Sequence, residues 1–188
     1  MLPLKPFYFI RHGETEWNRQ GIIMGQTDIP LNATGIKQAH KAKDILGQEN
    51  FSIIYTSPLQ RAYQTAQILI DDLEKDIVSE DLLKERYWGE LEGVPRAHVK
   101  ELMAQDRLSD AETFVNFEAR VLKALCQILN TSHVTPLIVA HSGVFIALTK
   151  MMGYSSLRTS NCIPFLFKPP EHKTHPWVIC NLSGEETL

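Results

Sequence analysis

Phe7-Tyr8-Phe9-Ile10 is a short apolar run that stops at Arg11-His12-Gly13. Because the run is short, rich in aromatic residues and bounded by a glycine, it predicts a buried strand. A second run of the same shape, Leu137-Ile138-Val139-Ala140, stops at His141-Ser142-Gly143. Two buried strands that each end in histidine and then glycine indicate a sheet that carries its chemistry at the ends of its strands.

Strand and helix patterns alternate along the rest of the chain. Further strands are expected at 52–56, 77–78, 161–167 and 176–181, and helices at about 31–46, 57–73, 96–105, 112–130 and 144–152. Ser57-Pro58 is expected to begin the helix after the second strand. Residues 14–30 and 80–97 are expected to be loops, and 168–175 a hairpin loop. Short apolar strands that alternate with helices predict an α/β fold, a three-layer α/β/α sandwich with a mainly parallel central sheet.

Composition bounds the class of protein. With 188 residues, the chain is expected to form a single domain, 1–188. The net charge of −3 argues against a nucleic-acid surface, which needs concentrated lysine and arginine. The longest apolar runs are far too short for a membrane span, and three scattered cysteines are typical of reduced thiols. A cytoplasmic protein with no nucleic-acid or membrane partner is expected; the oligomeric state stays open.

Two histidines and two arginines are candidates for one site. If the two His-Gly strands are neighbours, His12 and His141 emerge side by side at the carboxyl edge of the sheet, where such folds bind ligands. Arg11 and Arg61 would add fixed cations, and the helix that begins at Ser142 and Gly143 would add free amide groups. This set predicts a receptor for a dianion, most simply phosphate.

Ordered motifs extend from the first histidine along most of the chain. They are Arg11-His12-Gly13-Glu14-Thr15-Glu16-Trp17-Asn18, Gly25-Gln26-Thr27-Asp28-Ile29-Pro30-Leu31, Gly35 with Gln38-Ala39, Thr56-Ser57-Pro58-Leu59-Gln60-Arg61-Ala62 with Thr65-Ala66, Leu83-Lys84-Glu85, Gly89-Glu90-Leu91-Glu92-Gly93 and Val139-Ala140-His141-Ser142-Gly143. In this order they resemble the histidine phosphatase superfamily, the phosphoglycerate mutase-like proteins, whose RHGxTxxN signature the first motif matches. The resemblance spans about residues 7–152.

The resemblance implies a role for each matching residue. His12 would be the nucleophile that attacks phosphorus and becomes a phosphohistidine. We expect neighbouring cations to disfavour protonation of His12 and to spread charge in the transition state. Glu85 would protonate the leaving oxygen and then act as base, although by itself it would be read as a solvated loop carboxylate. The phosphoryl group would be bound by Arg11, His12, Asn18, Arg61, His141, Ser142 and Gly143.

The branch of the family is less sharply defined by sequence. The small phosphatases, such as the α-ribazole phosphatases, are favoured by the short segment after Gly93 and by Met24-Gly25 in place of the Thr-Gly of mutases. Glu85-Arg86 instead resembles the mutases, so a cofactor-dependent phosphoglycerate mutase is the alternative, and an inactive phosphate-binding relative is a third. Gly25, Gln26 and Arg86 are possible substrate contacts. The expected partner is a small phosphorylated metabolite, and a phosphoprotein substrate stays open. The resemblance implies no metal and no cofactor.

Overall fold

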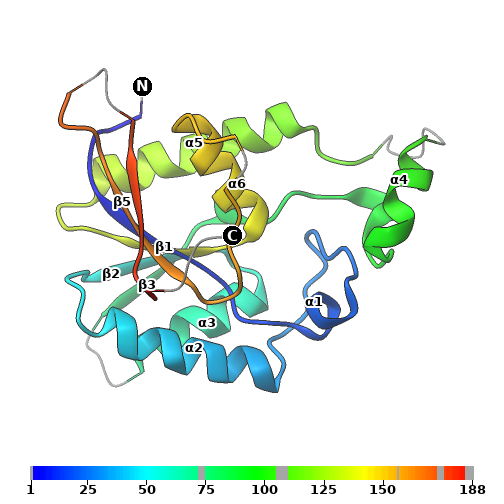
Figure 1. Cartoon of the computed structure of the whole chain (residues 1–188), viewed down its shortest axis with the longest axis horizontal. Helices are drawn as coiled ribbons and strands as arrows, with labels where there is room; N and C mark the ends of the chain where they lie inside the picture. The colour runs from blue at the N-terminus through cyan, green and yellow to red at the C-terminus, as the bar shows by residue number, and fades with distance from the viewer. Residues whose placement is uncertain (1, 72–74, 105–109, 156, 173–175, 185–188) are drawn as a thin grey trace.

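The computed structural model describes residues 2–71, 75–104, 110–155, 157–172 and 176–184. Within them, a six-stranded sheet has the order β3-β2-β4-β1-β5-β6 (Figure 1). The strands are β1 (Phe7–Arg11), β2 (Ile53–Thr56), β3 (Asp76–Ser79), β4 (Leu137–Ala140), β5 (Pro164–Lys168) and β6 (Val178–Asn181). β1 to β4 are parallel, whereas β5 is antiparallel to β1 and β6 to β5. The prediction of a mainly parallel sheet is confirmed.

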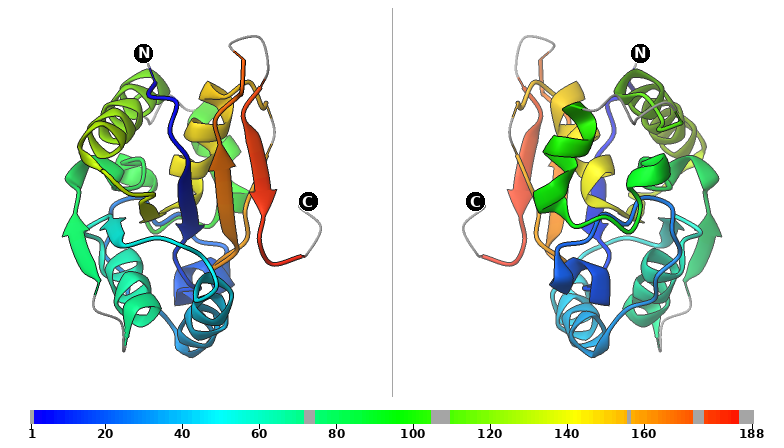
Figure 2. Two further views of the ribbon diagram at one scale, coloured as in Figure 1. Left: turned by 90° about the vertical axis from the view of Figure 1, so that its left-hand side faces the viewer. Right: turned by 90° about the vertical axis from the view of Figure 1, so that its right-hand side faces the viewer.

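Helices cover both faces of this sheet, as Figures 1 and 2 show. One layer contains α2 (Ala33–Leu46) and α3 (Gln60–Ile70), and the opposite layer contains α5 (Phe114–Thr131) and α6 (Ser142–Met151). Two further helices, α1 (Glu16–Gln20) and α4 (Arg96–Ala104), lie to one side of these layers (Figure 1). The predicted three-layer α/β/α sandwich is therefore confirmed. No helix in the described residues is long and apolar enough to cross a membrane.

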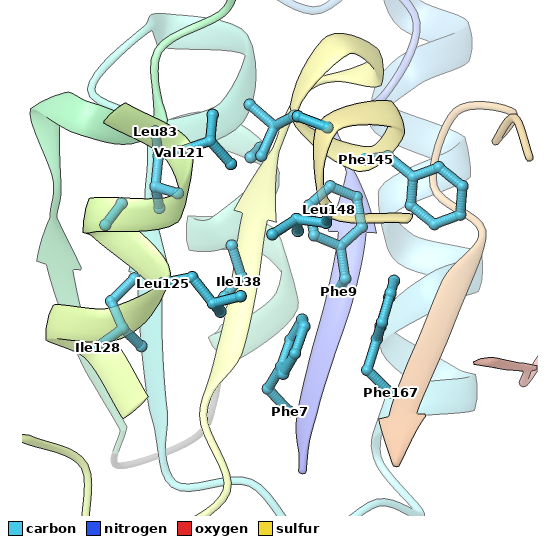
Figure 3. Close-up of a cluster of buried hydrophobic side chains, with 14 of the residues drawn as sticks. Phe7, Phe9, Leu83, Val121, Leu125, Ile128, Ile138, Phe145, Leu148 and Phe167 are labelled. Carbon is cyan, nitrogen blue, oxygen red and sulfur yellow. The ribbon is translucent and has the colours of Figure 1, made fainter. Parts of the chain in front are cut away.

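The central strand β1 is apolar on both of its faces because each face is covered. Phe7 and Phe9 point into the core beneath α5 and α6, where the ring of Phe9 lies 5.4 Å from that of Phe145 (Figure 3). Tyr8 and Ile10, which alternate with them, pack into the second core against α2 and α3. All four are buried. Such two-sided burial explains the unbroken apolar run, since a strand with one wet face would alternate with polar residues.

The expectation of a loop over the whole of 14–30 is wrong, because residues 16–20 form α1. Thr15 Oγ1 accepts a hydrogen bond from the amide of Asn18, while Asn18 Oδ1 accepts one from the amide of Thr15. The helix ends at Gly21, whose φ of 68° lies in the left-handed region. None of its five residues is buried, so hydrophobic periodicity could not reveal it.

Two other boundaries also differ from expectation. Ser57-Pro58 does not begin α3. The helix starts at Gln60, and its N-cap residue, Leu59, has no side chain that could accept a capping hydrogen bond. The Ser57 hydroxyl is engaged elsewhere, in the site described below. The expected loop at 80–97 contains two short 3₁₀ turns, η1 (Asp81–Leu83) and η2 (Gly89–Leu91), and its last two residues already belong to α4.

Candidate active site

The candidate residues meet where β1 and β4 end. These strands are paired, with Arg11 opposite Ala140, so that the next residues, His12 and His141, emerge together. Their ring centroids lie 5.2 Å apart. The two strands are neighbours, which is the condition under which the sequence placed both histidines in one site. A cavity of about 270 Å³ opens here and is lined by Arg11, His12, Asn18, Ile23, Met24, Gly25, Arg61, Glu85, Trp88, Arg96, Val99 and Ser142.

The ring of His12 is held in one tautomer. Its Nδ1 lies 2.7 Å from the carbonyl oxygen of Gly13. Because a carbonyl oxygen can only accept, Nδ1 carries the proton and the lone pair of the neutral ring resides on Nε2. Burial lowers the pKa of His12 well below its usual value, and Arg61 and Arg11 lower it further. The expected effect of the cations is present, but burial is the larger cause.

His141 is fully buried beside it. Its Nε2 lies 2.8 Å from the hydroxyl oxygen of Ser57, and its Nδ1 has no hydrogen-bond partner in the described part of the chain. Burial again lowers the pKa well below the usual value, followed by the charge of Arg61. Both histidines are therefore neutral near pH 7. Ser57 orients the ring of His141, and its hydroxyl oxygen also accepts a hydrogen bond from the amide of Leu59 at 3.3 Å.

Two arginines bring fixed positive charge to the cavity although both are largely buried. Burial lowers the pKa of each to about 10, so both stay charged at neutral pH. The guanidinium of Arg61 donates to the carbonyl oxygens of Gly25 at 2.7 Å and Thr27 at 2.9 Å. That of Arg11 donates to the carbonyl oxygen of Thr159 at 3.1 Å. The Nε atoms of both are buried without a partner among the described residues. An anion in the cavity would offset this costly burial of charge.

Glu85 lines the same cavity as His12, and its carboxylate is fixed at both oxygens. Oε1 accepts from the amide of Arg86 at 2.8 Å, and Oε2 accepts from the amide of Gly143 at 2.9 Å. Gly143 is the second residue of α6, so this carboxylate occupies one of the free amide groups at the start of the helix. The amide predicted to bind phosphate is thus taken by Glu85 in this structure.

The backbone that carries Arg11 and His12 is held from a second side by residues 159–162. The amide of Cys162 donates to the carbonyl oxygen of Arg11 at 3.0 Å, and Asn161 Nδ2 donates to that of His12 at 2.8 Å. Cys162 has a φ of 55°, unusual for a residue with a side chain. Together with the bond from Arg11 to Thr159, these contacts connect the entry of β5 to the end of β1.

Comparison with known proteins identifies the family. Residues 7–162 match the Histidine phosphatase superfamily (branch 1). The chain belongs to this superfamily. It is 38% identical over 147 residues to a Bacillus subtilis strain 168 protein described as "Uncharacterized phosphatase PhoE", covering 77% of this chain and 76% of that one. It is 33% identical over 192 residues to the "Probable phosphoglycerate mutase GpmB" of Enterobacter sp. strain 638, covering 91% and 86%.

Solved structures show the same fold. The α-ribazole phosphatase of Shigella flexneri superimposes with a TM-score of 0.77 at 24% identity, over 89% of this chain and 92% of that one. The family match over residues 7–162 confirms the expected resemblance to the histidine phosphatase superfamily. The matched relatives include both phosphatases and phosphoglycerate mutases.

Other candidate residues of this superfamily member lie at different distances from the cavity. Asn18, Gly25 and Ser142 line it. Gln26 does not line the cavity but holds the backbone of Glu85, because its Nε2 donates to the carbonyl oxygen of Glu85 at 3.1 Å. Arg86 lies in a neighbouring hollow, described below. Within the described residues, no three His, Cys, Asp or Glu side chains gather in a way that could hold a metal ion.

Sequence reasoning missed two residues that hold the cavity walls. Arg120, on α5, donates to the carbonyl oxygens of Leu82, Lys84 and Glu85 and pairs with Glu112, so it fixes the segment that carries Glu85. No sequence signal distinguishes it from a solvated arginine of an amphipathic helix.

Glu92 is the second. Its carboxylate accepts from the amides of Gln26, Thr27 and Trp88, and so ties together the loops on two sides of the cavity. Glu92 lies in the Gly89–Gly93 motif, but Glu90 lies in the same motif, so the sequence could not distinguish the two carboxylates. The described residues 168–171 of the expected hairpin loop line a separate hollow with Pro176 and Val178.

Proposed function

We propose that the chain is a metal-independent phosphatase that hydrolyses a phosphomonoester through a phosphohistidine on His12. One observation carries the proposal: the hydrogen bond from Nδ1 to Gly13 leaves the lone pair of a neutral, buried imidazole on Nε2. A neutral ring with a free lone pair is what nucleophilic attack on phosphorus requires. Membership of a superfamily with phosphatase relatives supports the same activity.

In the first step, His12 Nε2 forms a bond to phosphorus while the bond from phosphorus to the ester oxygen breaks. The phosphoryl oxygens would lie against Arg11, Arg61 and His141, with Asn18 donating a further hydrogen bond. Their charge would be stabilised most strongly as it grows in the transition state. Glu85, in its protonated form, would give its proton to the leaving oxygen, and the alcohol would depart.

In the second step, water attacks the phosphohistidine. The Glu85 carboxylate would accept a proton from this water as the new bond to phosphorus forms. The bond from Nε2 to phosphorus breaks, phosphate leaves, and the ring recovers its lone pair. The alternation of acid and base at one carboxyl group is supported by the place of Glu85 in the lining of the cavity that also contains His12.

Trapping of the phosphoenzyme tests this mechanism. Rapid quenching during hydrolysis of radiolabelled phenyl phosphate should give a label that is stable in alkali and lost in acid, as expected for a phosphoramidate. His12→Gln should abolish the label and lower turnover by at least about 10³-fold. His40→Gln is the matched control, because His40 is exposed on α2. Turnover by His12→Gln near the wild-type rate would overturn the proposal.

A product assay distinguishes the mutase alternative. The protein is incubated with 3-phosphoglycerate, with and without 2,3-bisphosphoglycerate. Free phosphate without 2-phosphoglycerate is expected of a phosphatase. Conversion to 2-phosphoglycerate that depends on the bisphosphate would instead establish mutase activity.

A further inference from the structure

A second hollow of about 350 Å³ adjoins the catalytic cavity. Four residues, Glu85, Trp88, Arg96 and Ser142, line both, so the two spaces share a wall. A phosphomonoester whose phosphoryl group lies at His12 would extend its leaving group past Glu85, since this carboxyl group must reach the ester oxygen. The hollow is therefore a natural place for the leaving alcohol.

Three arginines from separate segments line this hollow: Arg86, Arg96 and Arg158. The guanidinium of Arg86 is fixed, because its Nε donates to the carbonyl oxygen of Glu112 at 2.7 Å and its Cζ lies 3.8 Å from the ring centroid of Phe114. Its Nη1 is buried without a hydrogen-bond partner among the described residues. Arg96 and Arg158 are exposed, and neither side chain forms a hydrogen bond or ion pair within the described chain.

The carboxylates of the hollow form no ion pair with Arg96 or Arg158 in the described part of the chain. Glu118 pairs with Lys150 at 2.6 Å, and Glu85 accepts its hydrogen bonds from backbone amides. Arg96 and Arg158 therefore retain free donors and unbalanced positive charge. Since both line one hollow and keep free donors, they can offer charge-assisted hydrogen bonds to an acidic group of a ligand.

The remaining wall is apolar. It is formed by Trp88, Phe114, Phe117, Ile146 and Ala147. Such a surface favours a hydrocarbon body rather than a polyhydroxylated one, since hydroxyl groups placed against it would lose hydrogen bonds to water. Combined with the arginines, it selects an alcohol that is apolar along its length and anionic at its far end.

From this arrangement, which rests on the proposed phosphatase activity, we propose that the hollow is a subsite for the leaving group. Its ligand is a phosphomonoester whose alcohol has an apolar body and a second acidic group, bound by Arg96 and Arg158. A carboxylate and a second phosphate-type group share the chemistry that these arginines recognise. The arginines would discriminate among substrates without taking part in the bond-breaking step.

Matched aromatic substrates test the subsite. The acid substrate is 4-(2-carboxyethyl)phenyl phosphate, and its neutral counterpart is the corresponding carboxamide, which has the same length and a similar leaving group. A third substrate carries a phosphonate in place of the carboxylate and distinguishes the two acidic groups. The quantity measured is the ratio of kcat/KM for each acid to kcat/KM for the amide.

In the wild-type protein the ratio should be at least about 10 for one of the acids, and it should fall as salt is added. The double variant Arg96→Gln/Arg158→Gln should bring this ratio close to one, with kcat for the amide changing less than kcat/KM for the acid. Arg19→Gln is the control, since Arg19 is exposed on α1 and pairs with Glu16. It should keep the wild-type ratio.

A wild-type ratio near one, or a high ratio that persists in the double variant, would overturn the subsite while leaving the phosphatase intact. Hydrolysis of none of the three substrates, nor of phenyl phosphate, would overturn the proposed function and this inference with it. The two failures are therefore distinguishable by the turnover of phenyl phosphate alone.

Discussion

Gly143→Ala should displace the proposed acid while leaving the fold intact. A Cβ at this position would overlap Glu85 Oε1 and lie 3.0 Å from its Cδ. Gly143 does not have a positive φ, so alanine meets no backbone strain there. The overlapping group is the end of a flexible side chain, which can move aside. The cost therefore falls on the position of the carboxyl group rather than on stability.

The magnitude follows from the geometry. A new methyl group at this distance moves the carboxyl group by about 1 Å, and a misplacement of that size costs about 10²-fold in rate, or about 2.7 kcal/mol. This loss applies to alkyl phosphates, whose poor leaving groups need a proton. Nitrophenyl phosphate needs little protonation and should lose less than about 5-fold. The free energy of unfolding should change by no more than about 1 kcal/mol.

The assay compares kcat for an alkyl phosphate and for nitrophenyl phosphate in the wild type, Gly143→Ala and Gly47→Ala. Gly47 is a suitable control because it is the C-cap of α2, in the helix layer opposite α6, and has an ordinary φ of −62°. Urea unfolding of each variant verifies that the fold is retained. Equal losses on the two substrates, or unchanged turnover of the alkyl phosphate, would refute the assignment of Glu85 as the acid.

Three further outcomes are expected. The free energy of unfolding should decline as pH falls below about 6.5, because His12 and His141 bind protons in the unfolded chain but stay neutral when buried. Each histidine contributes up to about 1.4 kcal/mol of this decline per pH unit. Urea unfolding between pH 5 and 7.5 measures the slope, and a His12→Gln variant with an unchanged slope would contradict this cause. Asn161→Ala should lower kcat by about 10-fold with little change in KM, because it loses the hydrogen bond to the His12 carbonyl; wild-type kcat in steady-state assays would exclude this positioning role. Arg120→Gln should lower the free energy of unfolding by about 2–4 kcal/mol, because it leaves the backbone carbonyl of Glu85 without its charged donor; chemical denaturation would show no loss if these bonds contribute nothing.

The parts of the fold that sequence predicted are those with a strong local pattern. β1 and β4 are apolar on both faces, and α5 buries a regular stripe, so each could be recognised from its own residues. The helix α1 could not, because it has five residues and no buried face. It is held by the reciprocal bonds of Thr15 and Asn18, which occur within a motif that drew attention for its chemistry instead.

The candidate site divides in the same way. His12 and His141 could be placed together because each directly follows a buried strand, and only the pairing of those strands had to be assumed. The position of Glu85 could not be derived, because it lies between two turns rather than at the end of a strand. Its geometry depends on Gly143 and on Arg120, which are 58 and 35 residues away in the chain.

This division has a physical reason that bears on specificity. The proposed nucleophile, His12, and its neighbour His141 directly follow β1 and β4, whose local apolar patterns the sequence displays. The proposed acid, Glu85, and Arg86 in the wall of the second hollow are instead held by side-chain to backbone bonds between segments remote in sequence. Arg120 donates to the carbonyl oxygen of Glu85, and Arg86 donates to that of Glu112. Substitutions in those segments can reshape the hollow while the attachment of His12 to β1 stays unchanged. The residues of the proposed phosphoryl transfer can therefore be predicted from sequence, whereas the choice of substrate depends on contacts that only the folded chain brings together.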